Sequence, residues 1–188
     1  CCFFLGLAAV LWRGSAIPAF HVREEVPIIV VIDPGHGGED GGAVSPGGVA
    51  ESHINLAVSL RISDLLRFAG QRTQLTRSED VTICDKGLDT IRQRKTSDLK
   101  NRVKLVEETE NAVLMSIHQN SLPSSPVTHG AQVFWNRQEG AKELAASIQE
   151  TLNATVNAGN SKQPRQIPDS IYLMKSISAP GVLVECGF

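Results

Sequence analysis

Residues 27–51 decide the fold, and they read PIIVVIDPGHGGEDGGAVSPGGVAE. The stretch opens with a short apolar run between Pro27 and Pro34, which suits a strand covered on both faces in a parallel sheet. It then breaks into a loop with seven glycines that carries His36. A helix is expected to begin near Glu51. This arrangement lets a histidine at the end of a strand and a glutamate at the start of a helix approach each other as part of a metal site.

The composition is that of an ordinary globular protein. The chain has 188 residues, of which 41% are hydrophobic and 20% charged. This length suits one domain that buries about 70% of its unfolded surface. The net charge of -2 makes no general electrostatic case for nucleic acid or an anionic membrane as a partner. Lysines and arginines gather between residues 92 and 104, and we interpret them as a solvated surface.

The N-terminal segment has the character of a leader. Residues 3–11 read FFLGLAAVL and are followed by Arg13. This apolar run is too short to span a bilayer. It resembles the remnant of a signal peptide or anchor, which predicts an exported protein, although a short core helix is the alternative. We therefore expect residues 1–25 to be leader and linker and residues 26–188 to be one domain whose C-terminal end is truncated.

Strands and helices alternate along the rest of the chain. Strands are expected at residues 28–33, 73–76, 112–118, 131–135, 170–174 and 182–186. Helices are expected at residues 52–69, after an N-terminal cap at Asp98, and at residues 140–156. Residues 77–96 are polar and aperiodic, so we expect a surface insertion there. The alternation predicts a single α/β domain, a three-layer sandwich with a mainly parallel central sheet flanked by helices.

Polar side chains lie where the expected strands end. In open α/β sheets, sites gather outside the carboxyl ends of the strands. His36 follows the first strand with Asp33 nearby, His118 ends the strand at 112–118, and Glu185 lies near the end of the last strand. Glu51 opens the helix that returns from the same edge. We predict that this edge of the sheet brings these side chains together.

Two histidines and a glutamate match the needs of a catalytic zinc. Such a site has three protein ligands and keeps one position for water, whose pKa the metal lowers towards 7. A second carboxylate must then accept and return a proton. We predict that His36, Glu51 and His118 are the zinc ligands and that Glu185 is the acid/base.

Each of these residues has another possible role. His118, after an apolar run, could be a hydrogen-bonded core histidine. Glu51 could be a favourable charge at a helix N-terminus. Glu185 is harder to explain in this way, because burying a carboxylate without a partner in an apolar strand is costly. We interpret the remaining histidines as surface or loop residues; they are His21, His53 and His129.

A glycine-rich loop after a strand can also bind phosphate, but the details disfavour that function. The dinucleotide fingerprint requires G-x-G-x-x-G. Here the position of the third glycine is Asp40, and Asp33 and Glu39 would repel a pyrophosphate. The Lys-Ser/Thr pair of a P-loop is absent from this stretch. The four cysteines are not spaced as CxxC, which argues against a cysteine zinc cluster.

Four motifs in order carry a family resemblance. They are VVIDPGHGGEDGGA at 30–43, Glu51 with Asn55 four residues on, SIHQN at 116–120, and VLVECGF at 182–188. Together they resemble the zinc-dependent N-acetylmuramoyl-L-alanine amidases of bacterial cell walls, the amidase_3 family. The resemblance implies Zn²⁺ held by His36, Glu51 and His118, with Glu185 as the catalytic glutamate. It also implies hydrolysis of the amide between N-acetylmuramic acid and L-alanine, on peptidoglycan glycan strands that carry peptide stems.

Two further segments resemble the germination-specific branch of spore formers more narrowly. They are IRQRKTSDLKNRV at 91–103 and YLMKSISAPGVLVE at 172–185. This resemblance implies a role at the spore cortex, where a separate muramic-acid deacetylase helps to form muramic-δ-lactam. The alternative is a non-catalytic peptidoglycan-binding or scaffold domain of the same fold. A zinc peptidase would more often show HExxH, which this sequence lacks. Oligomeric state is left open.

Overall fold

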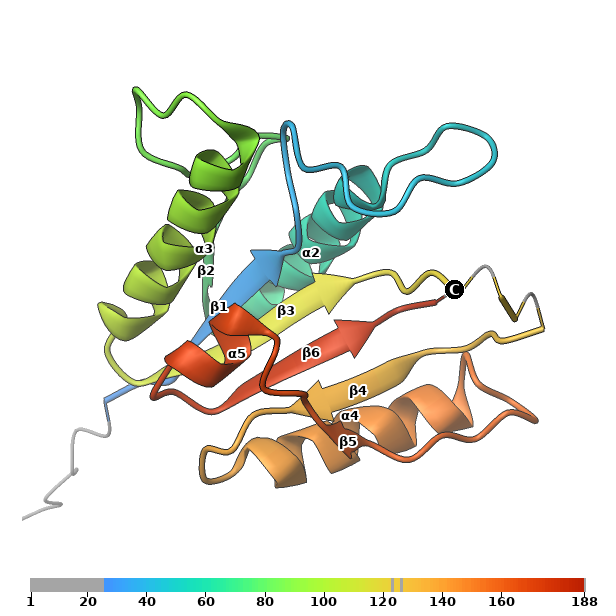
Figure 1. Cartoon of the computed structure of the whole chain (residues 1–188). Helices are drawn as coiled ribbons and strands as arrows, with labels where there is room; N and C mark the ends of the chain where they lie inside the picture. Colours follow the sequence, from blue (N-terminus) through green and yellow to red (C-terminus); the bar gives the residue numbers. More distant parts are fainter. Residues whose placement is uncertain (1–25, 123, 126, 188) are drawn as a thin grey trace, which may run out of the picture.

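The centre of the molecule is one six-stranded sheet (Figure 1). The computed structural model describes residues 26–122, 124–125 and 127–187. The strand order is β2-β1-β3-β6-β4-β5. The bounds are β1 Ile29–Pro34, β2 Arg72–Leu75, β3 Ala112–His118, β4 Gln132–Trp135, β5 Arg165–Gln166 and β6 Gly181–Glu185. Strands β2, β1, β3 and β6 run parallel, whereas β4 runs antiparallel to β6. The prediction of a mainly parallel sheet is confirmed.

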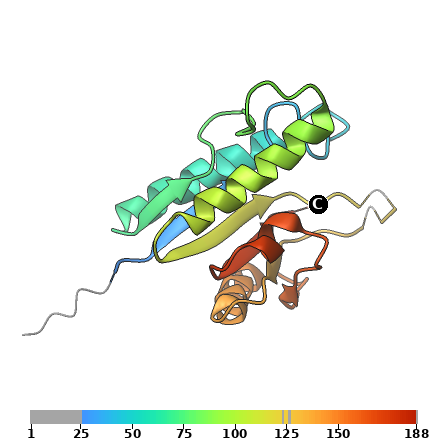
Figure 2. The same cartoon turned by 60° about the vertical axis from the view of Figure 1, so that its left-hand side comes forward.

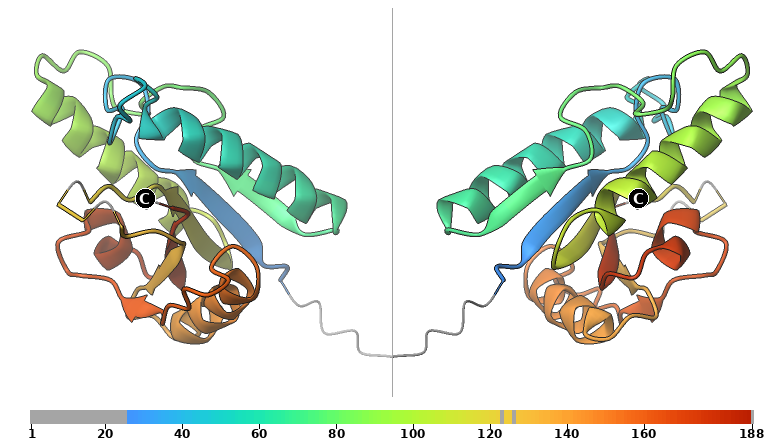
Figure 3. Two further views of the ribbon diagram at one scale, coloured as in Figure 1. Left: turned by 90° about the vertical axis from the view of Figure 1, so that its right-hand side faces the viewer. Right: turned by 90° about the vertical axis from the view of Figure 1, so that its left-hand side faces the viewer.

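Helices cover both faces of this sheet. Their bounds are α2 Glu51–Phe68, α3 Ile91–Glu107, α4 Ala141–Ala154 and α5 Tyr172–Ser176. Helices α2 and α4 lie on one face, and α3 and α5 lie on the other (Figure 3). Figure 2 shows α3 on the near side of the sheet. The predicted three-layer sandwich is therefore confirmed.

The apolar run of β1 serves two cores at once. Side chains alternate between the faces of a strand. Val31 packs with Leu114 in the core under α3 and α5, whereas Ile32 packs with Ile117 in the core under α2 and α4. All four side chains are at most 1% exposed. This two-sided burial explains why the strand is apolar at successive positions.

The parallel strands end at the same edge of the sheet, and their register places specific residues side by side. Asp33 of β1 lies opposite Ser116 of β3, and His118 of β3 lies opposite Glu185 of β6. Paired residues on neighbouring strands point to the same face. Two of the predicted site residues are therefore adjacent because of the sheet itself.

The expected strand at 170–174 is wrong. Residues Tyr172–Ser176 form helix α5, which buries Leu173 and Met174 against the sheet. Short apolar runs fit a buried helix turn as well as a strand. The strand at this edge of the sheet is instead β5, which has two residues and lies in a stretch where we expected no strand.

The expected insertion at 77–96 is also partly wrong. Helix α3 begins at Ile91, where Thr90 and Gln93 form a capping box, so Asp98 lies inside the helix and is not its cap. Arg77 is 3% exposed and Arg102 is 2% exposed. The interpretation of the basic cluster as a solvated surface therefore fails for Arg102.

The predicted leader, residues 1–25, lies outside the described residues. Among the helices of the described part of the chain, none combines the length and apolar character required to cross a membrane. The assignment of residues 1–25 and 26–188 to a leader and a domain stays a prediction.

Candidate metal centre and active site

Three side chains from distant parts of the sequence converge above the carboxyl edge of the sheet. His36 lies in the turn after β1, His118 is the last residue of β3, and Glu51 is the first residue of α2. One potential ligand atom from each residue lies within 4.8 Å of the other two. The Nδ1 of His118 is 3.0 Å from Oε1 of Glu51, and the Nε2 of His36 is 3.4 Å from the same oxygen. Imidazole nitrogen and carboxylate oxygen are donors that suit zinc.

The Glu51 carboxylate is held by its neighbours in the charged form. The backbone N–H of Ala43 donates to Oε2 at 3.0 Å, and the backbone N–H of Gln119 donates to Oε1 at 3.1 Å. The Asn55 amide also donates to Oε1, at 3.2 Å. Burial alone would raise the pKa of Glu51, but hydrogen bonds from His118, His36 and these backbone groups lower it below its usual value. A deprotonated carboxylate is what a metal ligand must be.

The His36 ring has a carboxylate partner on its other nitrogen. Its Nδ1 lies 3.0 Å from Oδ2 of Asp40, and Lys95 Nζ lies 2.9 Å from the same oxygen. This leaves Nε2 directed towards Glu51. Burial lowers the pKa of His36, but the hydrogen bonds to Glu51 and Asp40 outweigh it and raise the pKa. Metal-bound histidines usually have such a partner, which fixes the tautomer and the ring orientation.

Asp40 had no such role in the sequence-based prediction, which considered it only as a residue that would repel phosphate. A tight turn brings it back: Gly37 and Asp40 form an isolated bridge, with Gly37 N–H donating to Asp40 O at 2.8 Å. The sequence did contain a signal for this role, because Asp40 lies four residues after the predicted ligand His36.

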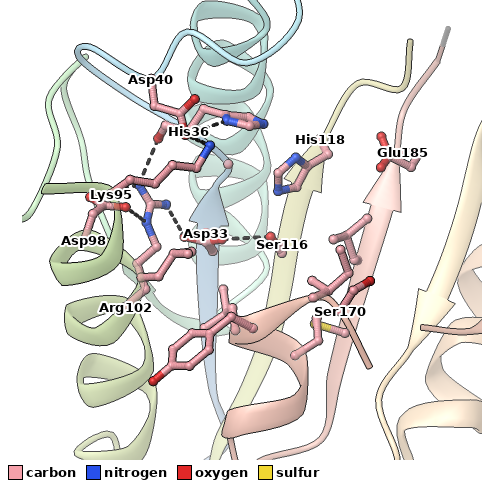
Figure 4. Close-up of a pocket in the computed structure, with 17 residues that line it drawn as sticks. Asp33, His36, Asp40, Lys95, Asp98, Arg102, Ser116, His118, Ser170 and Glu185 are labelled. Atoms are coloured by element: carbon pink, nitrogen blue, oxygen red, sulfur yellow. Dashed lines mark hydrogen bonds and ion pairs between the residues drawn. The ribbon is translucent and has the colours of Figure 1, made fainter. Parts of the chain in front are cut away.

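Glu185 stands beside the three converging residues with a free oxygen. It lies opposite His118 in the sheet, and both line the same cavity (Figure 4). Its Oε2 is buried and has no hydrogen-bond partner among the described residues. Burial raises the pKa of the carboxyl above its usual value, and the neighbouring Glu51 carboxylate acts in the same direction. A carboxyl in this state is suited to accept and release a proton.

The three residues contribute to the lining of two cavities. One has a volume of about 360 Å³ and is lined by His36, His118 and Glu185 together with residues of α3 and α5. The other, of about 570 Å³, is lined by Glu51 and by the loops that include Val44 and Leu122. Cavities of this size accommodate small-molecule ligands or segments of a polymer.

The remaining candidates do not join this centre. The Asp33 carboxylate pairs with Arg102 at 2.5 Å and accepts hydrogen bonds from Thr76 and Ser116. His53 is exposed and lies 2.9 Å from Asp80. His129 is also exposed, as expected, whereas His21 lies outside the described residues.

A glycine beside the centre provides a test of its geometry. Gly42 has φ of +68°, and a Cβ there would come within 2.5 Å of Glu51 Oε2 and 2.7 Å of His36 Cδ2. Gly48 has φ of +81°, but a Cβ there would meet nothing within 4 Å. Both alanine substitutions strain the backbone, but only one crowds the centre.

We expect Gly42→Ala to weaken zinc binding at least about 10-fold, a loss typical of disturbed partners around a metal. Gly48→Ala should bind zinc as the unmodified protein does. Competition with a chromogenic chelator measures both affinities. Equal zinc affinities for the two variants would contradict the observed placement of Gly42 against the centre.

Comparisons with known proteins agree on one family. Residues 30–188 match the model of Amidase_3, N-acetylmuramoyl-L-alanine amidase. A germination-specific N-acetylmuramoyl-L-alanine amidase of Bacillus subtilis is 34% identical over 160 residues, which are 85% of this chain and 66% of that protein. The amidase AmiA of Escherichia coli is 30% identical over 79% of this chain and 45% of its own length. The aligned part of this chain therefore covers at most about two thirds of the length of either relative.

Solved structures give the same result. The CwlD amidase of Clostridioides difficile, solved in complex with the GerS lipoprotein, has a TM-score of 0.80 and 35% identity, covering 85% of this chain and 82% of that one. The catalytic domain of CwlV, an amidase of Bacillus (Paenibacillus) polymyxa, has a TM-score of 0.64 and 30% identity, covering 85% and 79%.

Proposed function

The chain belongs to the Amidase_3 family of N-acetylmuramoyl-L-alanine amidases, and from this we propose that it is a zinc-dependent peptidoglycan amidase. Its substrate is the amide bond between N-acetylmuramic acid and L-alanine, on glycan strands that carry peptide stems. The observation that carries the proposal is the convergence of His36, Glu51 and His118 beside the Glu185 carboxyl, whose buried Oε2 has no hydrogen-bond partner among the described residues.

These residues fit zinc chemistry. His36, Glu51 and His118 would hold the ion with two nitrogens and one oxygen. When bound, zinc supplies a Lewis acid that polarises the scissile carbonyl and makes water more acidic. Asp40 keeps the His36 ring oriented, and Asn55 keeps the Glu51 carboxylate in place.

Glu185 moves the proton. Its carboxylate accepts a proton from the water that adds to the carbonyl carbon. It then gives this proton to the nitrogen of L-alanine as the C–N bond breaks, so that the stem leaves as a neutral amine. The lactyl group of muramic acid keeps the new carboxyl. The raised pKa of Glu185 suits a group that must both take and return the proton.

We further propose a role in spore-cortex maturation. The support is the resemblance of residues 91–103 and 172–185 to the germination-specific branch and the similarity to the Bacillus subtilis relative. In this role the chain is exported and acts on the cell-wall side of the membrane. It removes peptide stems so that a muramic-acid deacetylase can help to form muramic-δ-lactam.

A non-catalytic peptidoglycan-binding or scaffold domain is the alternative function. Such a domain needs no proton acceptor beside the metal. In such a domain, burial of the Glu185 Oε2, which no described residue hydrogen-bonds, would lower stability and serve no function. The chemistry of this one group therefore favours the enzyme.

Mass spectrometry of muropeptides tests both parts of the proposal. Purified cortex-type and vegetative-type peptidoglycan are incubated with the protein, with and without a zinc chelator. We expect stems with a free L-alanine amino group, faster release from cortex-type glycan, and no release with chelator. Cleavage inside the glycan or the stem, or binding without cleavage, would contradict the amidase. Equal turnover of both substrates would contradict only the cortex role.

A further inference from the structure

The backbone of the turn that carries His36 is held by side chains. The carbonyls of Pro34 and His36 each accept hydrogen bonds from both Arg77 and Arg102, at 2.8–3.0 Å. The carbonyl of Gly35, between them, accepts from Arg77 Nη2 at 3.1 Å and from Asn55 at 3.2 Å. Three successive carbonyls therefore each accept two side-chain hydrogen bonds.

This turn requires such support because its conformation is unfavourable. His36 has φ of +62°, in the left-handed region that residues with a Cβ seldom adopt. Backbone strain of this kind persists only where the surroundings over-determine it. The same turn directs the His36 ring towards Glu51, so its geometry decides where a ligand nitrogen lies.

Arg77 reaches the second ligand segment as well. Its Nη2 donates to the carbonyl of Ser52 at 3.0 Å, and Ser52 directly follows Glu51. One planar guanidinium thus spans the turn of His36 and the first turn of α2. The fit is close: a Cβ at Gly37 would come within 2.8 Å of Arg77 Nε.

The charge of Arg77 is not explained by ion pairing alone. Its side chain is fully buried, and the carboxylate that pairs with it among the described residues is that of Asp80, at 4.0 Å. Arg102, in contrast, pairs with Asp33 and Asp98 at 2.5 and 2.7 Å. Burying a guanidinium mainly against carbonyl oxygens carries a desolvation penalty that opposes folding. A role in fixing the two ligand-bearing segments relative to each other would explain why the charge is buried here.

We propose that Arg77 is a positioning residue of the metal centre, which sets the spacing of His36 and Glu51 by binding the backbone of both segments. It does not touch the metal or the substrate. This inference rests on the proposed function, because it needs the zinc site that the three ligands form.

The test compares zinc affinity in Arg77→Met and Arg77→Lys with that in a matched control. Gln149→Met is the control, because Gln149 of α4 is 1% exposed and bonds the backbone of Ala131 and Val133, a segment that carries none of the proposed ligands. Chelator competition gives the affinities, and denaturant unfolding gives the stabilities. The absorption spectrum of the Co²⁺-loaded protein reports the ligand geometry.

We expect Arg77→Met to bind zinc about 10–100-fold more weakly, the loss usual for partners that orient metal ligands, and to shift the Co²⁺ spectrum. Arg77→Lys should recover only part of this affinity, because an ammonium cannot span the same carbonyls as a planar fork. Gln149→Met should lose stability without either change.

Unchanged zinc affinity and an unchanged Co²⁺ spectrum in Arg77→Met would overturn the inference. If that variant does not fold, Arg77→Lys decides, since it keeps the buried charge and loses the fork. An equal loss of affinity in Gln149→Met would also overturn it, because the effect would then follow stability. Absence of zinc binding in the unmodified protein would contradict the proposed function itself.

Discussion

Glu185→Gln is expected to fold, to keep its zinc and to hydrolyse peptidoglycan about 10²–10⁴-fold more slowly. The amide is close to the carboxyl in shape but cannot accept a proton at neutral pH. Val184 and Cys186 pack into the core under α2 and α4, so Glu185 points to the opposite face, as His118 does. The loss should therefore be one of proton transfer and not of packing.

Three measurements on this variant separate the possible roles of Glu185. They are zinc content, unfolding free energy and the rate of stem release. Glu150→Gln, an exposed position on α4, is the matched control and should behave like the unmodified protein. Loss of zinc from Glu185→Gln would make Glu185 a ligand and reopen the role of Glu51. Unchanged activity would show that the proposed mechanism is wrong.

His118→Ala is expected to lose most of its zinc and at least as much activity as Glu185→Gln. Removal of one of three protein ligands leaves a site that cannot hold zinc firmly. The fold should survive, because His118 ends β3 at the edge of the sheet and 22% of its side chain is exposed. The variant thus tests the metal site without removing core packing.

Elemental analysis of His118→Ala after extensive dialysis gives the answer. The control is His53→Ala, which removes an exposed histidine that pairs with Asp80 outside the converging group. It should retain about one zinc per chain. Full zinc occupancy in His118→Ala would exclude His118 from the ligands.

The sheet and the convergence of the candidate ligands were predictable because they follow from local patterns. Apolar runs mark β1, β3 and β6 as buried strands, and parallel strands end at the same edge. Polar residues that end such strands must therefore lie close together. This reasoning predicted that His118 and Glu185 lie close together, although it could not give the register. The structure shows that they are direct partners on β3 and β6.

The errors arose where a pattern is ambiguous or a signal was overlooked. Residues 170–174 fit a short strand as well as one helical turn, and only packing against the sheet decides for α5. For α3, the spacing of Thr90 and Gln93 is that of a capping box, a local signal that outweighs Asp98 as a cap.

The buried arginines could not be recognised from local sequence. Arg102 is buried because Asp33, 69 residues away, supplies its counter-charge. Arg77 is buried because the carbonyls of a turn 41–43 residues away face it. A charged residue in a polar segment looks solvated until the fold brings such partners to it.

The most direct test of the central claim is a crystal structure of the protein with zinc, with anomalous scattering recorded on both sides of the zinc absorption edge. The claim predicts one strong anomalous peak bonded to His36, Glu51 and His118, with the Glu185 carboxylate beside it but not bonded. A peak elsewhere, or one bonded to Glu185 in place of Glu51, would contradict it.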